Sequence, residues 1–193
     1  MPKGIMENVE SLRKRLLQVL REKSVERGRF QLTSGRWSDY YVDGKQTTLD
    51  AEGCYLIGKL LFHKIRSEKE FPKGIGGVTL GADPIVTAVS LVSYLEGRPL
   101  PAFIIRKQPK GHGTGRWIEG LKNIAPGGEV VIVEDVLTTG GTLLEGVRRA
   151  REAGFEVRRV YALIDRQEGG RENIEAASLV LDPLFTRDEL LAE

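Results

Sequence analysis

Apolar residues follow a helical period at the start of the chain and short unbroken runs further on. The first pattern predicts an amphipathic helix over residues 6–27, ended by Gly28. Its apolar face consists of Val9, Leu12, Leu16, Leu17 and Leu20. Residues 30–32 and 40–43 are expected to be short extended segments around a turn. Asp50 can cap a second amphipathic helix, which we expect over residues 51–67.

From residue 74 onward, short apolar runs alternate with helical segments. The runs are typical of strands buried on both faces, and they cover residues 76–80, 102–105, 130–133, 157–164 and 178–181. Helices are expected after Pro84, over residues 142–153 and after Thr186. Thr142 with Glu145, and Thr186 with Glu189, match the capping-box pattern at the start of the last two.

Alternating strands and helices predict an α/β fold, a doubly wound and mainly parallel sheet flanked by helices. The length of 193 residues suits one domain. We therefore expect a single domain over 1–193, in which residues 1–48 form an appendage and residues 49–193 form the α/β core. Ligands of such sheets bind beyond the carboxyl ends of the strands, which directs attention to the loops there.

The composition excludes several classes of protein. The 29 Lys and Arg residues against 27 Asp and Glu give a net charge of +2, which does not favour nucleic acid as a partner. One cysteine rules out an internal disulfide, and two histidines disfavour a metal site built by the protein. Because no run approaches about 18 apolar residues and no apolar leader is visible, we expect a cytoplasmic protein without a membrane partner.

Two carboxylates, Glu134 and Asp135, end the apolar run at 130–133 and precede a Thr- and Gly-rich loop that leads into a helix. Backbone N–H groups at a helix N-terminus form a cradle for an anion. The loop matches neither a Walker A nor a GxGxxG motif. A sugar phosphate fits both features, with its phosphate in the loop and its hydroxyls at the carboxylates. The alternative is an ordinary turn with two solvated acids.

A second loop, residues 106–116, carries four Lys or Arg residues, three glycines and no acid. Cationic side chains on such a loop can close over a polyanionic leaving group and stabilise its developing negative charge. A solvated basic loop and a patch for nucleic acid are the alternatives.

The segment 130–142 resembles the signature of the type I phosphoribosyltransferases. In that family the loop holds the 5-phosphate of phosphoribosyl pyrophosphate (PRPP), and the acidic pair meets the ribose hydroxyls. The resemblance implies the type I phosphoribosyltransferase fold and PRPP contacts from Glu134, Asp135, Val136, Leu137, Thr138, Thr139, Gly140, Gly141 and Thr142. Leu80 and Gly81 stand where the family binds pyrophosphate through backbone groups, although many bacterial relatives have lysine at the position of Gly81.

Three further segments resemble the orotate branch of this family. Residues 106–113 are similar to its catalytic loop, and the similarity implies catalytic and PRPP-binding roles for Arg106, Lys107, Lys110 and His112, with Lys110 the most important. Residues 32–43 resemble its base-binding hood, and residues 165–170 resemble a motif whose arginine binds orotate. The orotate-binding residues implied are Thr138, Arg166, Tyr40, Tyr41 and Lys45. Thr33 and Val42 depart from the hood pattern, since many relatives have a lysine and an aromatic residue there.

The resemblance covers roughly residues 10–190 and implies a pentosyltransferase of de novo pyrimidine (UMP) biosynthesis, which converts orotate and PRPP to orotidine 5′-monophosphate and pyrophosphate. It also implies Mg²⁺ held mainly by PRPP and water, and a homodimer in which the 106–118 loop acts across subunits. Two other interpretations stay open: a phosphoribosyltransferase for a purine or another base, and a PRPP-sensing regulatory protein with the same fold.

Overall fold

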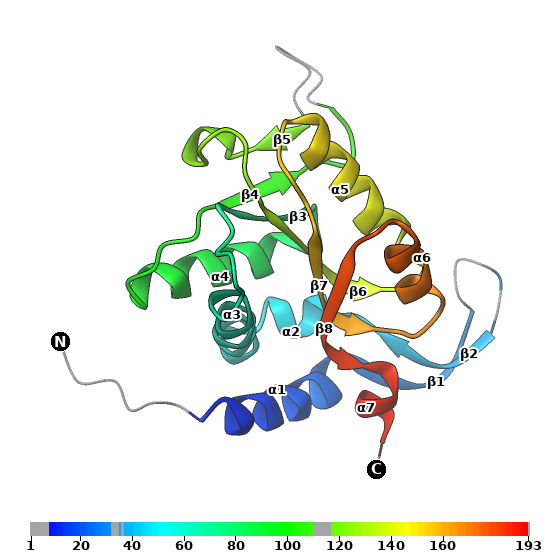
Figure 1. Ribbon diagram of the computed structural model, residues 1–193. Coiled ribbons are helices and arrows are strands. Elements are labelled where there is room, and N and C mark those ends of the chain that lie inside the picture. Colours follow the sequence, from blue (N-terminus) through cyan, green and yellow to red (C-terminus); the bar gives the residue numbers. More distant parts are fainter. Residues whose placement is uncertain (1–7, 32–34, 36, 110–116, 193) are drawn as a thin grey trace.

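The computed structural model describes residues 8–31, 35, 37–109 and 117–192. The main sheet of this part of the chain is mainly parallel (Figure 1). Its strands are β3 (Ile75–Val78), β4 (Ala102–Ile105), β5 (Ile118–Glu119), β6 (Val131–Leu137), β7 (Arg159–Asp165) and β8 (Val180–Thr186). They lie in the order β5-β4-β3-β6-β7-β8, and within this sheet only the pairing of β4 with β5 is antiparallel.

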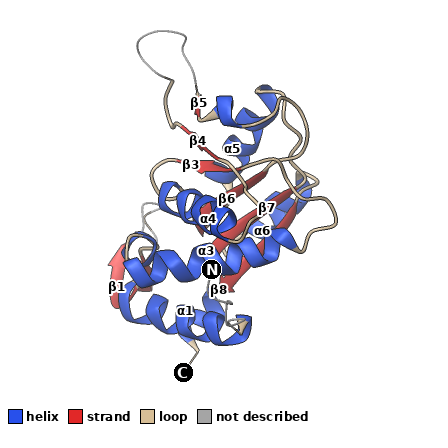
Figure 2. Cartoon of the chain, turned by 90° about the vertical axis from the view of Figure 1, so that its left-hand side faces the viewer, coloured by secondary structure: helices blue, strands red, loops and turns tan. Residues whose placement is uncertain are grey.

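Helices cover both faces of the sheet, as the alternation of strands and helices predicts. On one face lie α1 (Val9–Lys23), α3 (Ala51–Arg66) and α4 (Asp83–Leu95), and Figure 2 shows α3 and α4 in front of the sheet. On the other face lie α5 (Gly141–Glu152) and α6 (Gly170–Ala176). The shorter helices are α2 (Lys45–Thr48), α7 (Arg187–Leu191) and a 3₁₀ turn over Leu121–Asn123. The doubly wound α/β fold is therefore confirmed.

The order of the strands reverses between β3 and β6. From β3 the chain continues outward to β4, whereas from β6 it continues in the other direction to β7 and β8. The connections after β3 and β6 therefore lead to opposite sides, and the carboxyl ends of these neighbouring strands are left open to a ligand.

The start of the chain differs from the prediction. Helix α1 ends at Lys23 rather than at Gly28, and β1 (Val25–Gln31) pairs antiparallel with β2 (Trp37–Val42). Gly28 instead lies in β1, at a shift of register between Arg27 and Phe30. The polar residues after Lys23 contribute nothing to the apolar face of the helix, so pairing with β2 prevails over helix propensity. Figure 1 shows this hairpin beside the ends of β6 and β7.

One of the two predicted capping boxes is confirmed, and the other is wrong. Thr186 and Glu189 exchange hydrogen bonds at the start of α7. Helix α5, however, begins at Gly141 after Gly140 with φ 84°, so Thr142 and Glu145 lie inside the helix. Glu145 pairs with Arg148 and Arg149 instead. No side chain of the described residues caps α5, so the N–H groups of its first turn are left for a ligand.

Replacing Thr186 with alanine is expected to lower the free energy of unfolding by about 1 kcal/mol, because α7 loses its cap. Thr142→Ala is the matched control, since Thr142 caps nothing and alanine favours the helix interior. Urea denaturation of both variants measures the difference. Equal losses in the two variants would contradict the assignment of the cap.

Candidate active site

The acidic pair lies in the second half of β6, because the strand continues to Leu137, beyond the run at 130–133 that the sequence predicts. Glu134 is 7% exposed and Asp135 is 9% exposed. Asp135 accepts a hydrogen bond from the backbone N–H of Val136 at 2.9 Å, whereas Glu134 Oε2 has no hydrogen-bond partner among the described residues. A buried carboxylate oxygen without a partner is costly, and a ligand that donates a hydroxyl would satisfy it.

Two glycines allow other segments to approach Asp135 closely. A Cβ atom at Gly81, in the loop between β3 and α4, would overlap the carboxylate of Asp135. A Cβ atom at Gly44, just before α2, would lie 3.4 Å from the Cβ of Asp135. The β3–α4 loop and the segment after β2 therefore both lie close to Asp135.

Burial, together with the neighbouring charge of Asp135, raises the pKa of Glu134 to about 8, while Lys107 opposes the shift. The pair therefore holds a proton at neutral pH. Lys107 belongs to the described end of the basic loop, so its electrostatic effect on Glu134 relates that loop to the acidic pair of the same chain.

The loop after β6 forms a cavity of about 170 Å³ at the N-terminus of α5. Its lining consists of Glu134, Val136, Leu137, Thr138, Thr139, Gly140, Gly141, Thr142 and Leu143. Asn173 of α6 supports the loop by donating a hydrogen bond to the carbonyl of Thr139 at 2.9 Å. Backbone N–H groups, threonine hydroxyls and the positive end of a helix make this cavity suitable for a phosphate.

A second cavity, of about 510 Å³, lies between the β3–α4 loop and the basic loop. It is lined by Thr79, Asp83, Ile104, Arg106, Lys107, Gln108 and Glu119. Thr79 Oγ1 donates to Asp83 Oδ2 at 2.7 Å, and Arg106 pairs with Glu119 at 3.5 Å. Leu80 and Gly81 follow Thr79 in the loop. Lys110 and His112 lie outside the described residues.

Arg166 follows β7 and is buried, with 7% of its surface exposed. Its guanidinium carbon lies 5.4 Å from the ring centre of Tyr40, and Nη2 lies 2.7 Å from Glu168. Nε has no hydrogen-bond partner among the described residues. An arginine held in this way presents a planar donor to a ligand, which suits a carboxylate or an imide edge.

Tyr41 and Lys45, which are also predicted to bind the base, contact other residues. Neighbouring residues of a strand point to opposite faces, and Tyr41 packs on Phe30, at 5.7 Å between ring centres, rather than beside Tyr40. Lys45 pairs with Asp43 at 2.6 Å. The hydrogen bond that Lys45 donates to Asp43 raises the pKa of Lys45, and the charge of Asp135 adds to the effect. Lys45 is thus coupled to the acidic pair, while Tyr40 faces Arg166.

Sequence patterns assigned no role in this site to Gly44 or Asp83. Gly44 and Gly81 matter because Asp135, distant in the sequence, lies against both. Among the described residues, no group of three or more His, Cys, Asp or Glu side chains could hold a metal ion. None of the described helices has both the length and the apolar character needed to span a membrane.

Comparison with known proteins agrees with this geometry. Residues 75–184 match the family model of the phosphoribosyl transferase domain. The orotate phosphoribosyltransferase of Aquifex aeolicus is 48% identical, over 93% of this chain and 97% of that protein. The orotate phosphoribosyltransferase of a Nostoc species is 46% identical, over 93% and 85% respectively.

Solved structures give the same result. Orotate phosphoribosyltransferase of Mycobacterium tuberculosis in complex with PRPP is 34% identical and superimposes with a TM-score of 0.75, over 93% of this chain and 98% of that one. Its complex with Fe(III) dicitrate gives a TM-score of 0.80 at 38% identity, over 93% and 99%. Fold and comparisons together define a phosphoribosyltransferase. Within that family, the chain belongs to the orotate phosphoribosyltransferases.

Proposed function

We propose that this protein transfers the 5-phosphoribosyl group of PRPP to orotate, which gives orotidine 5′-monophosphate and pyrophosphate in de novo UMP biosynthesis. The observation that carries the proposal is the placement of three complementary groups at the ends of β6 and β7. They are the buried acidic pair, the uncapped N-terminus of α5 and the buried Arg166. The relatives named orotate phosphoribosyltransferase, 40–48% identical to this chain, support the choice of base.

Each part of the substrates has a proposed place. The 5-phosphate would bind in the loop after β6, from Val136 to Thr142, and the ribose hydroxyls at Glu134 and Asp135. Pyrophosphate would bind at the backbone of Leu80 and Gly81. The cations that meet it there would be Arg106, Lys107, Lys110 and His112. Orotate would bind at Arg166, Tyr40 and Thr138, with Tyr41 and Lys45 as the remaining candidates.

The proposed reaction is a displacement at the anomeric carbon. A ring nitrogen of orotate loses its proton to solvent or to the leaving pyrophosphate and forms the new bond, and the bond to pyrophosphate breaks with its electron pair leaving on the pyrophosphate oxygen. The protein contributes by positioning the two substrates and by stabilising the charge of the leaving group. Mg²⁺, bound to PRPP oxygens and water, would neutralise part of that charge. The unpaired oxygen of Glu134, which has no partner among the described residues, suits hydroxyls of such a complex.

We also propose the organisation of the chain and of its assembly. Residues 1–48 would form the N-terminal helix and base-binding hood of a single domain, and residues 49–193 its α/β core. The enzyme would be a cytoplasmic homodimer in which the 106–118 loop of one subunit acts at the site of the other. The single free cysteine, Cys54, suits a reducing compartment.

An absorbance assay tests the proposed activity. Purified protein with PRPP and Mg²⁺ should consume orotate, measured as the loss of its ultraviolet absorbance, and should leave adenine, hypoxanthine and uracil unchanged. Omission of PRPP is the control for non-enzymatic loss. Turnover of a purine without turnover of orotate would overturn the proposed function.

A further inference from the structure

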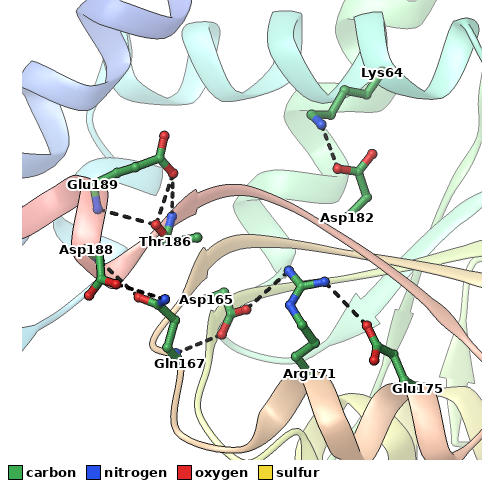
Figure 3. A network of polar contacts seen from close by, with 9 residues as sticks. All are labelled: Lys64, Asp165, Gln167, Arg171, Glu175, Asp182, Thr186, Asp188 and Glu189. Atoms are coloured by element: carbon green, nitrogen blue, oxygen red, sulfur yellow. Dashed lines mark hydrogen bonds and ion pairs between the residues drawn. The ribbon is translucent and has the colours of Figure 1, made fainter.

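The loop that carries Arg166 is held by contacts that the proposed reaction does not use (Figure 3). Asp165, at the end of β7, is 1% exposed and accepts a hydrogen bond from the backbone N–H of Gln167 at 2.8 Å. Its other oxygen lies 3.5 Å from Arg171 Nη2. The backbone N–H of Arg166 donates to the carbonyl of Leu137 at 2.9 Å. The start of this short turn is therefore fixed to both β6 and β7.

Gln167 completes the turn through an exchange of two hydrogen bonds with Asp188. Its Nε2 donates to Asp188 Oδ2 at 3.1 Å, and its Oε1 accepts from the backbone N–H of Asp188 at 3.1 Å. Gln167 has φ 55°, in the left-handed region that residues other than glycine rarely adopt. A residue that keeps such a conformation needs surrounding contacts to hold it, and Asp188 supplies them.

Helix α7, which carries Asp188, is itself attached to α1. Arg13 pairs with Glu189 and donates to the carbonyl of Leu184 at 3.0 Å. Arg21 Nη2 donates to the carbonyl of Glu189 at 2.7 Å. The pair formed by Gln167 and Asp188 therefore joins the Arg166 turn to a fixed support.

Arg166 depends on this turn because its charged partner belongs to the same turn. Its Nη2 lies 2.7 Å from the carboxylate of Glu168, two residues further along the chain. Among the described residues Nε has no hydrogen-bond partner, and the nearby Tyr40 ring offers contact without a hydrogen bond. The direction of the guanidinium therefore depends on how residues 166–168 are held, and Gln167 lies between the two partners of the ion pair.

We propose that Gln167 is a positioning residue for the base subsite, and that its paired hydrogen bonds with Asp188 direct the Arg166 guanidinium toward an acidic planar base. The inference rests on the proposed function. It assigns to α7, at the end of the described chain, a role in selecting the base, whereas PRPP is bound by the loops after β3 and β6.

The test begins with Gln167→Gly. Glycine adopts a φ of 55° without strain, so the variant removes the side chain and leaves the backbone conformation accessible. Loss of two hydrogen bonds is expected to raise KM for orotate about tenfold, while KM for PRPP changes less than about twofold. Ser178→Gly is the matched control, because Ser178 has φ 57° and precedes β8 at a distance from Arg166 in the sequence. It should leave both constants unchanged.

Variants that exchange the donor and the acceptor between residues 167 and 188 distinguish a positioning role from a purely stabilising one. Gln167→Glu places a carboxylate against Asp188 and should raise KM for orotate at least as much as Gln167→Gly. Combining it with Asp188→Asn restores a side-chain donor opposite the new carboxylate, and should return KM for orotate to within about threefold of the wild-type value. A purely structural role would change the melting temperature without this selective effect on orotate.

Calorimetry gives a second measurement that does not depend on turnover. Gln167→Gly should weaken binding of orotidine 5′-monophosphate about tenfold and leave binding of ribose 5-phosphate unchanged. If the wild-type protein does not use orotate, the proposed function fails. If the wild-type protein uses orotate but Gln167→Gly binds both ligands normally, or the double variant shows no recovery, the positioning role is overturned.

Discussion

Replacing Arg166 with methionine is expected to lower kcat/KM for orotate by about 10²–10³-fold, whereas KM for PRPP should change little. Arg166 is 7% exposed, and its Nε has no hydrogen-bond partner among the described residues, so this donor is available to an anionic base, while Nη2 pairs with Glu168 at 2.7 Å. Charge-assisted hydrogen bonds in a buried site contribute about 3–4 kcal/mol when two are lost together. Methionine fills similar space with apolar atoms but removes the ion pair that Arg166 makes with the largely buried Glu168, so the free energy of unfolding should also fall, by about 3 kcal/mol.

Steady-state kinetics with each substrate varied in turn measures this effect. Arg158→Met is the control, because Arg158 is a largely exposed residue that pairs with Glu129 and Glu156 before the start of β7. The kcat/KM of Arg166→Lys for orotate should lie between the values of wild type and Arg166→Met, since lysine keeps the charge but loses the planar pair of donors. Equal rises in KM for orotate and PRPP would show that Arg166 supports the whole site rather than the base.

The buried acidic pair gives the second large effect, a dependence of stability on pH. The folded protein raises the pKa of Glu134 from 4.5 to about 8, chiefly through burial. A carboxyl whose pKa is higher in the folded state binds its proton more tightly there. The resulting stabilisation is complete below about pH 4.5 and is lost as the pH rises toward 8. As the pH rises from about 5 to 8, the free energy of unfolding of the wild-type protein should therefore fall by a few kcal/mol relative to that of Glu134→Gln.

Urea denaturation of both proteins at several pH values between about 5 and 8 measures this difference. Glu145→Gln is the control. The hydrogen bond from Arg148 lowers the pKa of exposed Glu145, so its contribution is lost only at acidic pH and is constant over this range. If the free energies of unfolding of wild type and Glu134→Gln differ by the same amount at every pH in this range, Glu134 is ionised in the folded protein throughout.

Those features of the site that lie within one short segment could be predicted from the sequence. The strand, the acidic pair and the loop at 130–142 are contiguous, and so are Asp165 and Arg166, so each pattern is visible without knowledge of the fold. The end of α1 was missed because β1 forms through pairing with β2, which a helical period cannot reveal. The start of α5 was misplaced because Thr142 and Glu145 have the spacing of a capping box.

Contacts between distant segments explain the features of the site that the sequence did not predict. Tyr40 and Tyr41 look equivalent in the sequence, but the strand sends one toward Arg166 and the other toward Phe30. Gly44 acquires its significance from Asp135, and Gln167 from Asp188. Each of these pairs depends on where two segments of the chain meet, which local propensity does not determine.

The uncapped start of α5 would make a phosphate-bearing substrate a part of the folded structure in a thermodynamic sense. Because no side chain in the described part of the chain serves the first N–H groups of that helix, a bound phosphate would be the cap that the sequence omits. Ligand binding and folding are then linked, and a phosphate ligand at about 100 times its Kd would add about 2.7 kcal/mol to the free energy of unfolding. The loop that recognises the substrate would thus also be the place where the substrate protects the enzyme from unfolding.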